Sequence, residues 1–535
     1  MLKKILTGQS KSITAAAIIL GSASLVSRVL GILRDRILAG EFGAGNELDI
    51  YFAAFRIPDF IFNILVLGAL SAGFIPVFAS YLNKKEKAWE LVNNILHILS
   101  FCLILISILV FILAPWLVKI IAPGFSPSQL ATTAGMTRIM FLSPILLGIS
   151  GIFGSILQSL KRFFVYSLAP ILYNLGIIIG ALFFTEHLGI FGLAWGVILG
   201  AFMHLLIQLV AVVSLGYHYQ WQFNLNDKNL RRILKMMVPR TLTLIVSQIN
   251  FLAITIIGST LTVGSITIFN FANNIQSFPL GLFAISFAIA AFPTLAELAN
   301  KKRQFINTLS LTIRQILFLI IPSSVLLIVL RAQVVRVVLG SGRFDWEDTV
   351  LTLETLALFA VSLFAQALIL VLSRAFFALE DSKTPFYTGL ISVFSNIILA
   401  LMLSEKFGVA GLALAFSMST VLNFILLLLI LHYRLGQLDG DKISLAVIKI
   451  VIATFMMAIT AQAIKYPIGQ LFGTETFIGI GAQLLLASLG GGLAFLTTAY
   501  LLRTEELNTY LESLRKKFLK RPNVPEEIIE NEKLT

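Results

Sequence analysis

The chain contains an internal repeat that relates its first half to its second half. The segment IPVFASYLNKK, which includes Pro76, returns about 217 positions later as FPTLAELANKK, which includes Pro293. A second pair, TEHLGIFGLAWG and SEKFGVAGLALA, aligns Gly189 with Gly408 at nearly the same offset. Shared hydrophobicity alone rarely yields two distant matches at one offset, so the pattern indicates a duplicated structural unit.

The composition predicts a polytopic membrane protein. Apolar residues make up 58% of the chain and charged residues only 13%, and apolar runs longer than about 18 residues recur throughout, as in membrane-spanning helices. The first run is longer than the core of a signal peptide and leads into a second span, so we expect it to be retained. Reading runs of about 20 residues predicts an all-α protein with about fourteen transmembrane helices. They start near residues 13, 48, 91, 134, 166, 189, 236, 268, 309, 352, 385, 408, 444 and 476.

The loop charges predict the topology. Alternate loops carry cations, for example Lys84 and Lys85, Lys161 and Arg162, and the run 301–303, whereas the loop APGFSPSQ on the other side carries none. By the positive-inside rule both termini lie in the cytoplasm. Much of the net charge of +13 is then accounted for by topology, and no nucleic-acid partner is expected.

The repeat also predicts the domain organisation. Because the repeated unit holds six helices, an even number, both copies enter the membrane in the same orientation and are related by a pseudo-two-fold axis along the membrane normal. We expect a six-helix lobe over residues 1–220, a second over 221–436, an extra pair of transmembrane helices over 437–502, and a cytoplasmic tail over 503–535, helical at first and then disordered, with little role beyond solvation.

The sequence favours a transporter over an enzyme. It contains no glycine-rich phosphate loop, no zinc-protease motif and no serine-hydrolase motif, and its single cysteine, Cys102, lies in an apolar run. No catalytic residue, metal site or cofactor is therefore predicted.

The first predicted helix carries a charge deep in the membrane. Arg28 lies about 15 residues into the helix, or roughly 22 Å into a core about 30 Å thick. Such a charge is costly and usually marks a transport pathway. The alternative is an internal pair between Arg28 and an acid such as Asp35 or Asp49. Arg34 and Arg36 lie nearer the outer interface, and for Arg36 we expect only that its charge reaches the membrane surface.

The second and eighth predicted helices, which are repeat mates, are both interrupted. Interruptions at matching positions in two halves are a sequence pointer to a central transport site, although prolines can also simply bend helices. We expect the first, second, seventh and eighth helices to line the cavity. The prolines are Pro58, Pro76, Pro279 and Pro293, and the polar residues beside them are Asp59, Asn63, Asn273, Asn274 and Gln276.

The charges inside the predicted spans favour an anionic ligand. Few acids are expected deep in a span, whereas arginine can hold a phosphate through two parallel hydrogen bonds. A cavity that selects a drug or organic cation usually needs an intramembrane carboxylate.

Several motifs resemble those of one family. The stretch from Ser27 to Phe60 resembles the N-terminal signature of the MviN/MurJ-type lipid II flippases, members of the multidrug/oligosaccharidyl-lipid/polysaccharide exporter superfamily. The resemblance extends over nearly the whole chain, including the extra helix pair, and its supporting motifs are GFIPVF at 73–78, APGF at 122–125, SQI at 247–249 and DSKTP at 381–385.

The resemblance implies an alternating-access flippase of the bacterial plasma membrane. It would move lipid II, a polyprenyl-pyrophosphate-linked peptidoglycan precursor, to the outer leaflet for cell-wall synthesis, with the lipid tail along a groove formed by the two extra helices. A coupling ion is left open. Four positions depart from the family pattern: Phe62, Asn63 and Asn274 stand where the family has arginines, and Leu67 stands where it has a glutamate. A flippase for another lipid-linked oligosaccharide and a drug/cation antiporter remain alternatives. The residues expected to bind the substrate are Arg28, Arg34, Asp35, Asp49, Asn63, Asn273 and Asn274.

Overall fold

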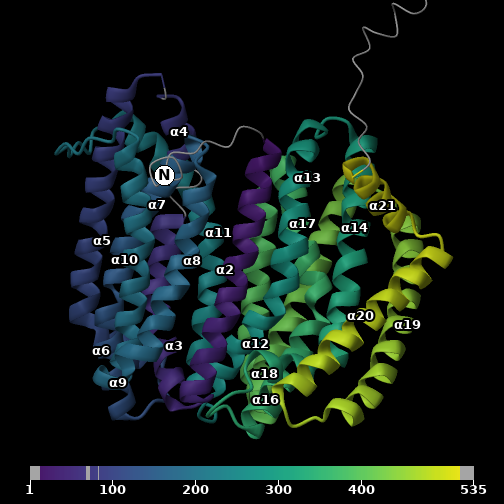
Figure 1. The fold of residues 1–535 in the computed structure, drawn as a ribbon. Coiled ribbons are helices and arrows are strands. Elements are labelled where there is room, and N and C mark those ends of the chain that lie inside the picture. Colours follow the sequence, from purple (N-terminus) through teal and green to yellow (C-terminus); the bar gives the residue numbers. More distant parts are fainter. Residues whose placement is uncertain (1–12, 68–72, 82, 519–535) are drawn as a thin grey trace, which may run out of the picture.

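The computed structural model describes residues 13–67, 73–81 and 83–518, and in these ranges the regular secondary structure is entirely helical (Figure 1). The first half contains α2 (Ile13–Phe42), α3 (Asn46–Ile61), the π-helix η1 (Phe62–Leu67), α4 (Ile75–Ala79), α5 (Lys85–Ile121), α6 (Pro127–Met140), α7 (Leu142–Ser159), α8 (Phe163–Ile179), the π-helix η3 (Gly180–Phe184), α9 (Thr185–Leu188) and α10 (Phe191–Ser214). The second half contains α11 (Lys228–Ser259), α12 (Ser265–Pro279), the π-helix η4 (Leu280–Ala284), α13 (Ile285–Glu297), α14 (Lys302–Val329), α15 (Arg331–Val338), α16 (Trp346–Val361), α17 (Leu363–Ala378) and α18 (Lys383–Leu435). The chain then continues through α19 (Gly440–Phe472), α20 (Phe477–Leu501) and α21 (Glu505–Phe518).

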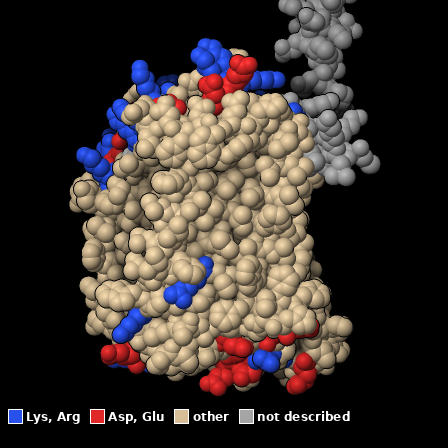
Figure 2. Space-filling model, turned by 90° about the vertical axis from the view of Figure 1, so that its left-hand side faces the viewer, with Lys and Arg blue, Asp and Glu red and all other residues tan. Residues whose placement is uncertain are grey.

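Long apolar helices confirm the membrane fold. Among the described residues, nine helices are long and apolar enough to cross a bilayer, or ten if α16 and α17, bent by 43°, form one span. Helix α18 counts once in this number although its backbone breaks at Gly408. The face in Figure 2 has a broad belt almost free of charged residues between two charged ends. The total of fourteen transmembrane helices stays a prediction.

The backbone repeats its irregularities in both halves, as expected for a duplicated unit. Gly189 (φ 56°, ψ −146°) and Gly408 (φ 56°, ψ −135°) adopt the same left-handed geometry, which glycine tolerates best. A Cβ on Gly192 would lie 2.5 Å from the carbonyl carbon of Phe184, and a Cβ on Gly411, its repeat mate, would lie 2.3 Å from a backbone oxygen. The π-helices η1 and η4 also fall at matching positions of the repeat.

The helices form two lobes and an appended pair (Figure 1). On the left of the view α5, α6, α7, α8 and α10 lie together, and on the right α13, α14, α16, α17 and α18 form the second group. Helix α2 packs on α8, and α11 packs on α18. Helices α19 and α20 pack on each other and reach the second lobe mainly through α14. The predicted domain boundaries remain a hypothesis.

The two lobes are closely joined at the end opposite the described N-terminus. The Arg343 backbone N–H donates to the Gly40 carbonyl at 2.8 Å. A Cβ on Gly264 would lie 2.0 Å from the Ala44 carbonyl oxygen, so the backbones touch there. The side chain of Asp348 accepts from the Ala44 N–H at 2.9 Å. This end of the molecule is therefore closed.

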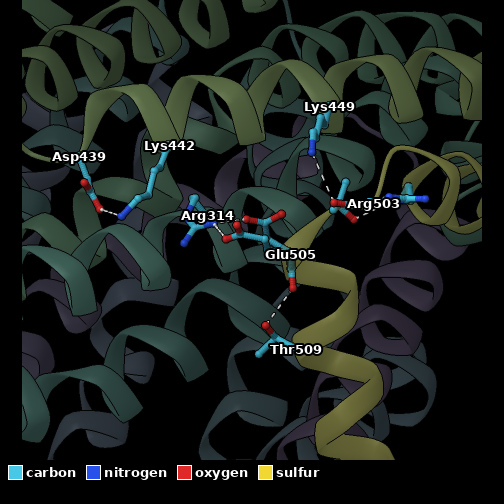
Figure 3. A network of polar contacts seen from close by, with 10 residues as sticks. Arg314, Asp439, Lys442, Lys449, Arg503, Glu505 and Thr509 are labelled. Carbon is cyan, nitrogen blue, oxygen red and sulfur yellow. Dashed lines mark hydrogen bonds and ion pairs between the residues drawn. The ribbon is translucent and has the colours of Figure 1, made fainter.

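The C-terminal tail does more than solvate, contrary to expectation. Helix α21 begins with Glu505 and Glu506, whose carboxylates accept hydrogen bonds from Arg314 of α14 at 2.7 and 2.9 Å (Figure 3). The Tyr510 ring stacks on that of Phe318, with centroids 5.8 Å apart. The amphipathic α21 is thus docked on the second lobe, and residues 519–535 lie outside the described part of the chain.

Candidate functional site

A cavity of about 360 Å³ lies between the two lobes and is contributed mainly by the first. Its wall comes from α2, α3, η1, α7, α8 and α10 of the first lobe and from α12 of the second. The polar side chains that line it are Arg34, Tyr51, Arg56, Asp59, Ser143, Tyr173, His204, Asn270 and Asn274.

Arg34 and Asp35 form an ion pair that reaches both lobes. The Arg34 guanidinium donates to the Asp35 carboxylate at 2.7 and 3.0 Å and to the Asn174 amide oxygen of α8 at 3.1 Å. The other carboxylate oxygen of Asp35 accepts from the Asn274 amide of α12 at 2.9 Å. Three residues expected at the site, Arg34, Asp35 and Asn274, are therefore brought together.

Arg56 is the second cavity arginine, and the sequence analysis missed it. From α3 it donates to the Thr255 hydroxyl at 2.8 Å and to the Asn270 amide oxygen at 2.7 Å, and its guanidinium lies 5.5 Å from the centre of the Phe251 ring. All three partners belong to the second lobe and are uncharged. Arg56 lies about ten residues into α3, so the depth argument used for Arg28 could have found it.

The cavity also contains an acid, Asp59, which the sequence analysis named beside the prolines but did not include among the substrate-binding residues. Asp59 lines the wall one helical turn after Arg56, and the positive charge of Arg56 attracts the Asp59 carboxylate. His204, which also lines the wall, forms a hydrogen bond of 2.8 Å between its Nδ1 atom and the Ser150 hydroxyl. The turn between Arg56 and Asp59 keeps both charges on one face of α3, so the cavity holds a carboxylate beside its second arginine.

Arg28 lies outside this cavity, in a space left by a glycine of the other lobe. A Cβ on Gly281 of η4 would lie only 2.0 Å from a guanidinium nitrogen of Arg28. Arg28 makes no hydrogen bond or ion pair with another described residue, so the alternative pairing with Asp35 or Asp49 is not seen. Its six-residue distance from Arg34 corresponds to about 9 Å along α2.

Asp49 joins the lobes away from the cavity. Its carboxylate accepts from the Gly264 N–H at 2.7 Å, the Thr267 N–H at 2.8 Å and the Thr267 hydroxyl at 2.7 Å. Only 4% of its surface is exposed. Asp49 therefore caps the N-terminus of α12, where a carboxylate is favourable, and does not line the cavity.

The last two expected site residues make local contacts. The Asn63 amide donates to the Asp59 backbone carbonyl at 2.8 Å, within η1 and α3. The Asn273 amide oxygen accepts from Gln276 at 3.1 Å, next to a bond between Gln276 and Gln366 of α17. Neither Asn63 nor Asn273 lines the cavity.

The helices around the cavity differ in part from those expected. The first, second and eighth predicted helices contribute, but the wall comes from α7, α8 and α10 rather than from α11. Helix α11 acts indirectly, because Thr255 accepts from Arg56. Arg36 does not simply reach the surface, since it donates to the Val337 carbonyl at 2.6 Å and lies 4.8 Å from the centre of the Phe477 ring.

Sequence comparisons connect this architecture to a family. The family model described as "Lipid II flippase MurJ" matches residues 38–480. The "Probable lipid II flippase MurJ" of Buchnera aphidicola from Acyrthosiphon pisum is 30% identical over 499 residues, which are 92% of this chain and 97% of that protein. Its counterpart in Vibrio cholerae is 31% identical over 440 residues, covering 79% of this chain and 84% of that protein.

Solved structures agree with the sequence comparisons. A structure titled "Lipid II flippase MurJ, inward closed conformation" superposes with a TM-score of 0.75 at 26% identity, covering 90% of this chain and 98% of that one. An inward-facing multidrug resistance MATE transporter of the MOP superfamily gives a TM-score of 0.66 at 14% identity, covering 79% of this chain and 99% of that one, and shows the shared fold alone. Since the family model spans most of the chain and relatives of similar length are at least 30% identical to it, the chain belongs to the lipid II flippase MurJ family.

Proposed function

We propose that this protein moves lipid II, or a closely related polyprenyl-pyrophosphate glycolipid, from the inner to the outer leaflet by alternating access. Membership of the family and the many apolar helices make it a multi-pass protein of the bacterial inner membrane. The family is one of transporters rather than of catalytic enzymes. The observation that carries the proposal is the pair of cavity arginines, Arg34 and Arg56.

The two arginines suit a pyrophosphate because it can displace their uncharged hydrogen-bond partners, a hydroxyl and two amides, from the guanidinium groups. Arg56 donates to a hydroxyl and an amide, and one Arg34 nitrogen donates to an amide. A charge-assisted bond between a guanidinium and a phosphate is roughly twice as strong as a neutral hydrogen bond. A pyrophosphate entering the cavity therefore replaces the oxygens of Thr255, Asn270 and Asn174, while Asp35 keeps Arg34 oriented.

The same contacts couple substrate binding to the movement of the lobes. Arg56 and Asp35 each bond residues of the second lobe. When the substrate takes over the guanidinium of Arg56, those inter-lobe bonds are lost and the balance between the two arrangements of the lobes shifts. Opening at the other end then requires release of the Asp49 contact with α12.

Arg28, Asn63 and Asn273 stay within the proposal as secondary substrate contacts. The Arg28 guanidinium extends from α2 to Gly281 of η4 and pairs with no other described residue, as expected for a charge that meets the substrate along its path. We assign the lipid tail to the surface of α19 and α20. We also propose that both termini are cytoplasmic, because the loops at that end carry most of the lysines and arginines, and that any coupling ion acts through the cavity charges.

One observation favours a second candidate. Asp59 supplies the cavity carboxylate that a cation or drug antiporter needs. Its neighbour Arg56 opposes a cationic ligand, so the flippase remains the better supported function.

Complementation separates the two functions. Expression of this protein in a bacterium depleted of its own lipid II flippase is expected to restore growth, and the Arg56→Ala variant is expected to fail although it reaches the membrane. Growth failure with the wild type, together with increased resistance to cationic drugs, would favour the antiporter.

A further inference from the structure

A second cavity is separate from the central one and larger than it. It measures about 1140 Å³ and lies between α14, α17, the second part of α18 and the start of α19. We call it the α19 groove. None of its lining residues belongs to α20 or to the first lobe, so neither the substrate cavity nor the surface shared by α19 and α20 includes it.

The depth of the α19 groove is apolar. Leu317, Leu368 and Leu428 line it from three different helices, and Leu429 at its edge is 48% exposed toward the surrounding membrane. Lys302 and Ile321 both line the groove and are 19 residues apart on α14, which corresponds to about 28 Å along the helix. This exceeds half of the ~30 Å hydrocarbon core, so the groove is long enough for one acyl chain of a single leaflet.

The mouth of the α19 groove is charged. Lys302 and Arg303 line it and make no ion pair with another described residue. The Lys302 ammonium lies 3.9 Å from the position of a Cβ on Gly436, directly over the turn into α19. Lys442 is paired with Asp439 at 3.3 Å (Figure 3). With Asp441, the ionised lining residues sum to one net positive charge.

The internal repeat offers a natural comparison. Lys302 and Ile306 correspond to Lys85 and Trp89 in the first lobe, and the cavity that these two residues line there measures about 380 Å³. The indole ring of Trp89 lines that smaller cavity, whereas the second lobe has the shorter Ile306 and the added wall of α19. The long apolar groove is therefore a property of one lobe.

We propose that the α19 groove is a binding site for an anionic phospholipid with a single net negative charge, such as phosphatidylglycerol. One acyl chain fills the apolar depth, and the phosphate binds Lys302 and Arg303. The net charge of the mouth complements that of the lipid, and basic pockets between transmembrane helices are known to attract anionic head groups. A lipid bound there contacts α14, α18 and α19 together and so stabilises the position of α19, independently of the central cavity.

The test is titration of the purified full-length protein in detergent with phosphatidylglycerol, followed by native mass spectrometry. Removing both cations in the double variant Lys302→Ala, Arg303→Ala is expected to weaken binding roughly 30-fold, at about 1 kcal/mol for each cation. Lys85→Ala, which removes the repeat-equivalent cation, is the matched control and should bind as the wild type does.

A second variant tests the apolar depth. Ile306→Trp copies the residue of the first lobe and should block the acyl chain, whereas Ile306→Leu should not. Circular dichroism and thermal melting check that each variant is folded. If Ile306→Trp is unstable, the double variant still tests the proposal, because Lys302 and Arg303 are exposed and their replacement does not disturb the core.

Three results would overturn the proposal. The first is equal binding by the wild type and the double variant. The second is equal binding of zwitterionic phosphatidylcholine. The third is one-for-one displacement of phosphatidylglycerol by a polyprenyl pyrophosphate, which would assign the groove to the tail of the transported lipid. Lipid II translocation is measured separately, so failure here leaves the proposed function untouched.

Discussion

Gly281→Ala should impair transport without harming the fold. An added Cβ would lie 2.0 Å from a guanidinium nitrogen of Arg28. Because nonbonded atoms need about 3.5 Å, the guanidinium must move by about 1.5 Å. It is the flexible end of a long side chain, so it can move, and replacing glycine by alanine inside a helix is worth roughly 0.5–1 kcal/mol in favour of the helix.

The expected loss of lipid II affinity depends on the contact that the displaced Arg28 guanidinium makes. If Arg28 meets the phosphate of the substrate, the displacement removes a hydrogen bond to a charged group, worth about 1.5–3 kcal/mol. This corresponds to a loss of about 10- to 140-fold in affinity for lipid II.

The assay compares lipid II binding and thermal melting for three purified proteins. The control is Gly31→Ala on α2, because a Cβ on Gly31 meets nothing within 4 Å. We expect Gly281→Ala to melt no lower than the wild type and to bind lipid II weakly, while Gly31→Ala binds normally. Equal binding by Gly281→Ala and Gly31→Ala would refute the assignment of Arg28 to the substrate path.

Three further predictions concern closure, topology and the docked tail. Asp49→Asn removes the charge that holds the N-terminus of α12, where each hydrogen bond to the carboxylate is worth about 1.5–3 kcal/mol. Amide hydrogen exchange at the start of α12 should therefore accelerate. Unchanged exchange would contradict the role of Asp49 in closure. With the native cysteine removed, a cysteine at Ser126 should react with an impermeant reagent from outside and one at Asn83 should not, and the reverse pattern would invert the topology. The hydrogen bond from Arg314 lowers the pKa of Glu505, so the docking of α21 should be intact at neutral pH and lost as the pH falls below the usual carboxyl range. Limited proteolysis across this range measures it, and release at higher pH would contradict the assignment.

The sequence predicts the helices well but their ends poorly. The expected starts near 48, 91 and 309 fall at Asn46, Lys85 and Lys302, because the helices continue beyond the hydrocarbon core that a hydropathy pattern detects. The break of α18 was predictable from the repeat, since Gly408 matches Gly189. The docking of α21 was not, because a charged helix reads as solvated until its buried partner, Arg314, is known.

The site shows a similar limit. Arg28 was placed roughly 22 Å into the hydrocarbon core by counting from Ile13, but α2 has 30 residues, about 45 Å, and is longer than the core. Arg34 therefore occupies the cavity and Arg28 lies about 1.7 helical turns away. Which polar side chains meet depends on packing between segments far apart in the chain, as for Asp35 and Asn274, and no pattern in one sequence reveals it.

The most direct test of the proposed function is translocation of lipid II in reconstituted vesicles, measured by the accessibility of its head group to an external enzyme. The wild-type protein should transfer lipid II across the bilayer. The double variant Arg34→Ala, Arg56→Ala should insert normally but transfer no more than empty vesicles do, while Arg56→Lys should retain part of the activity, because one ammonium cannot reproduce the two-point grip of a guanidinium. Transfer by the double variant at the wild-type rate, or no transfer by the wild type, would contradict the account.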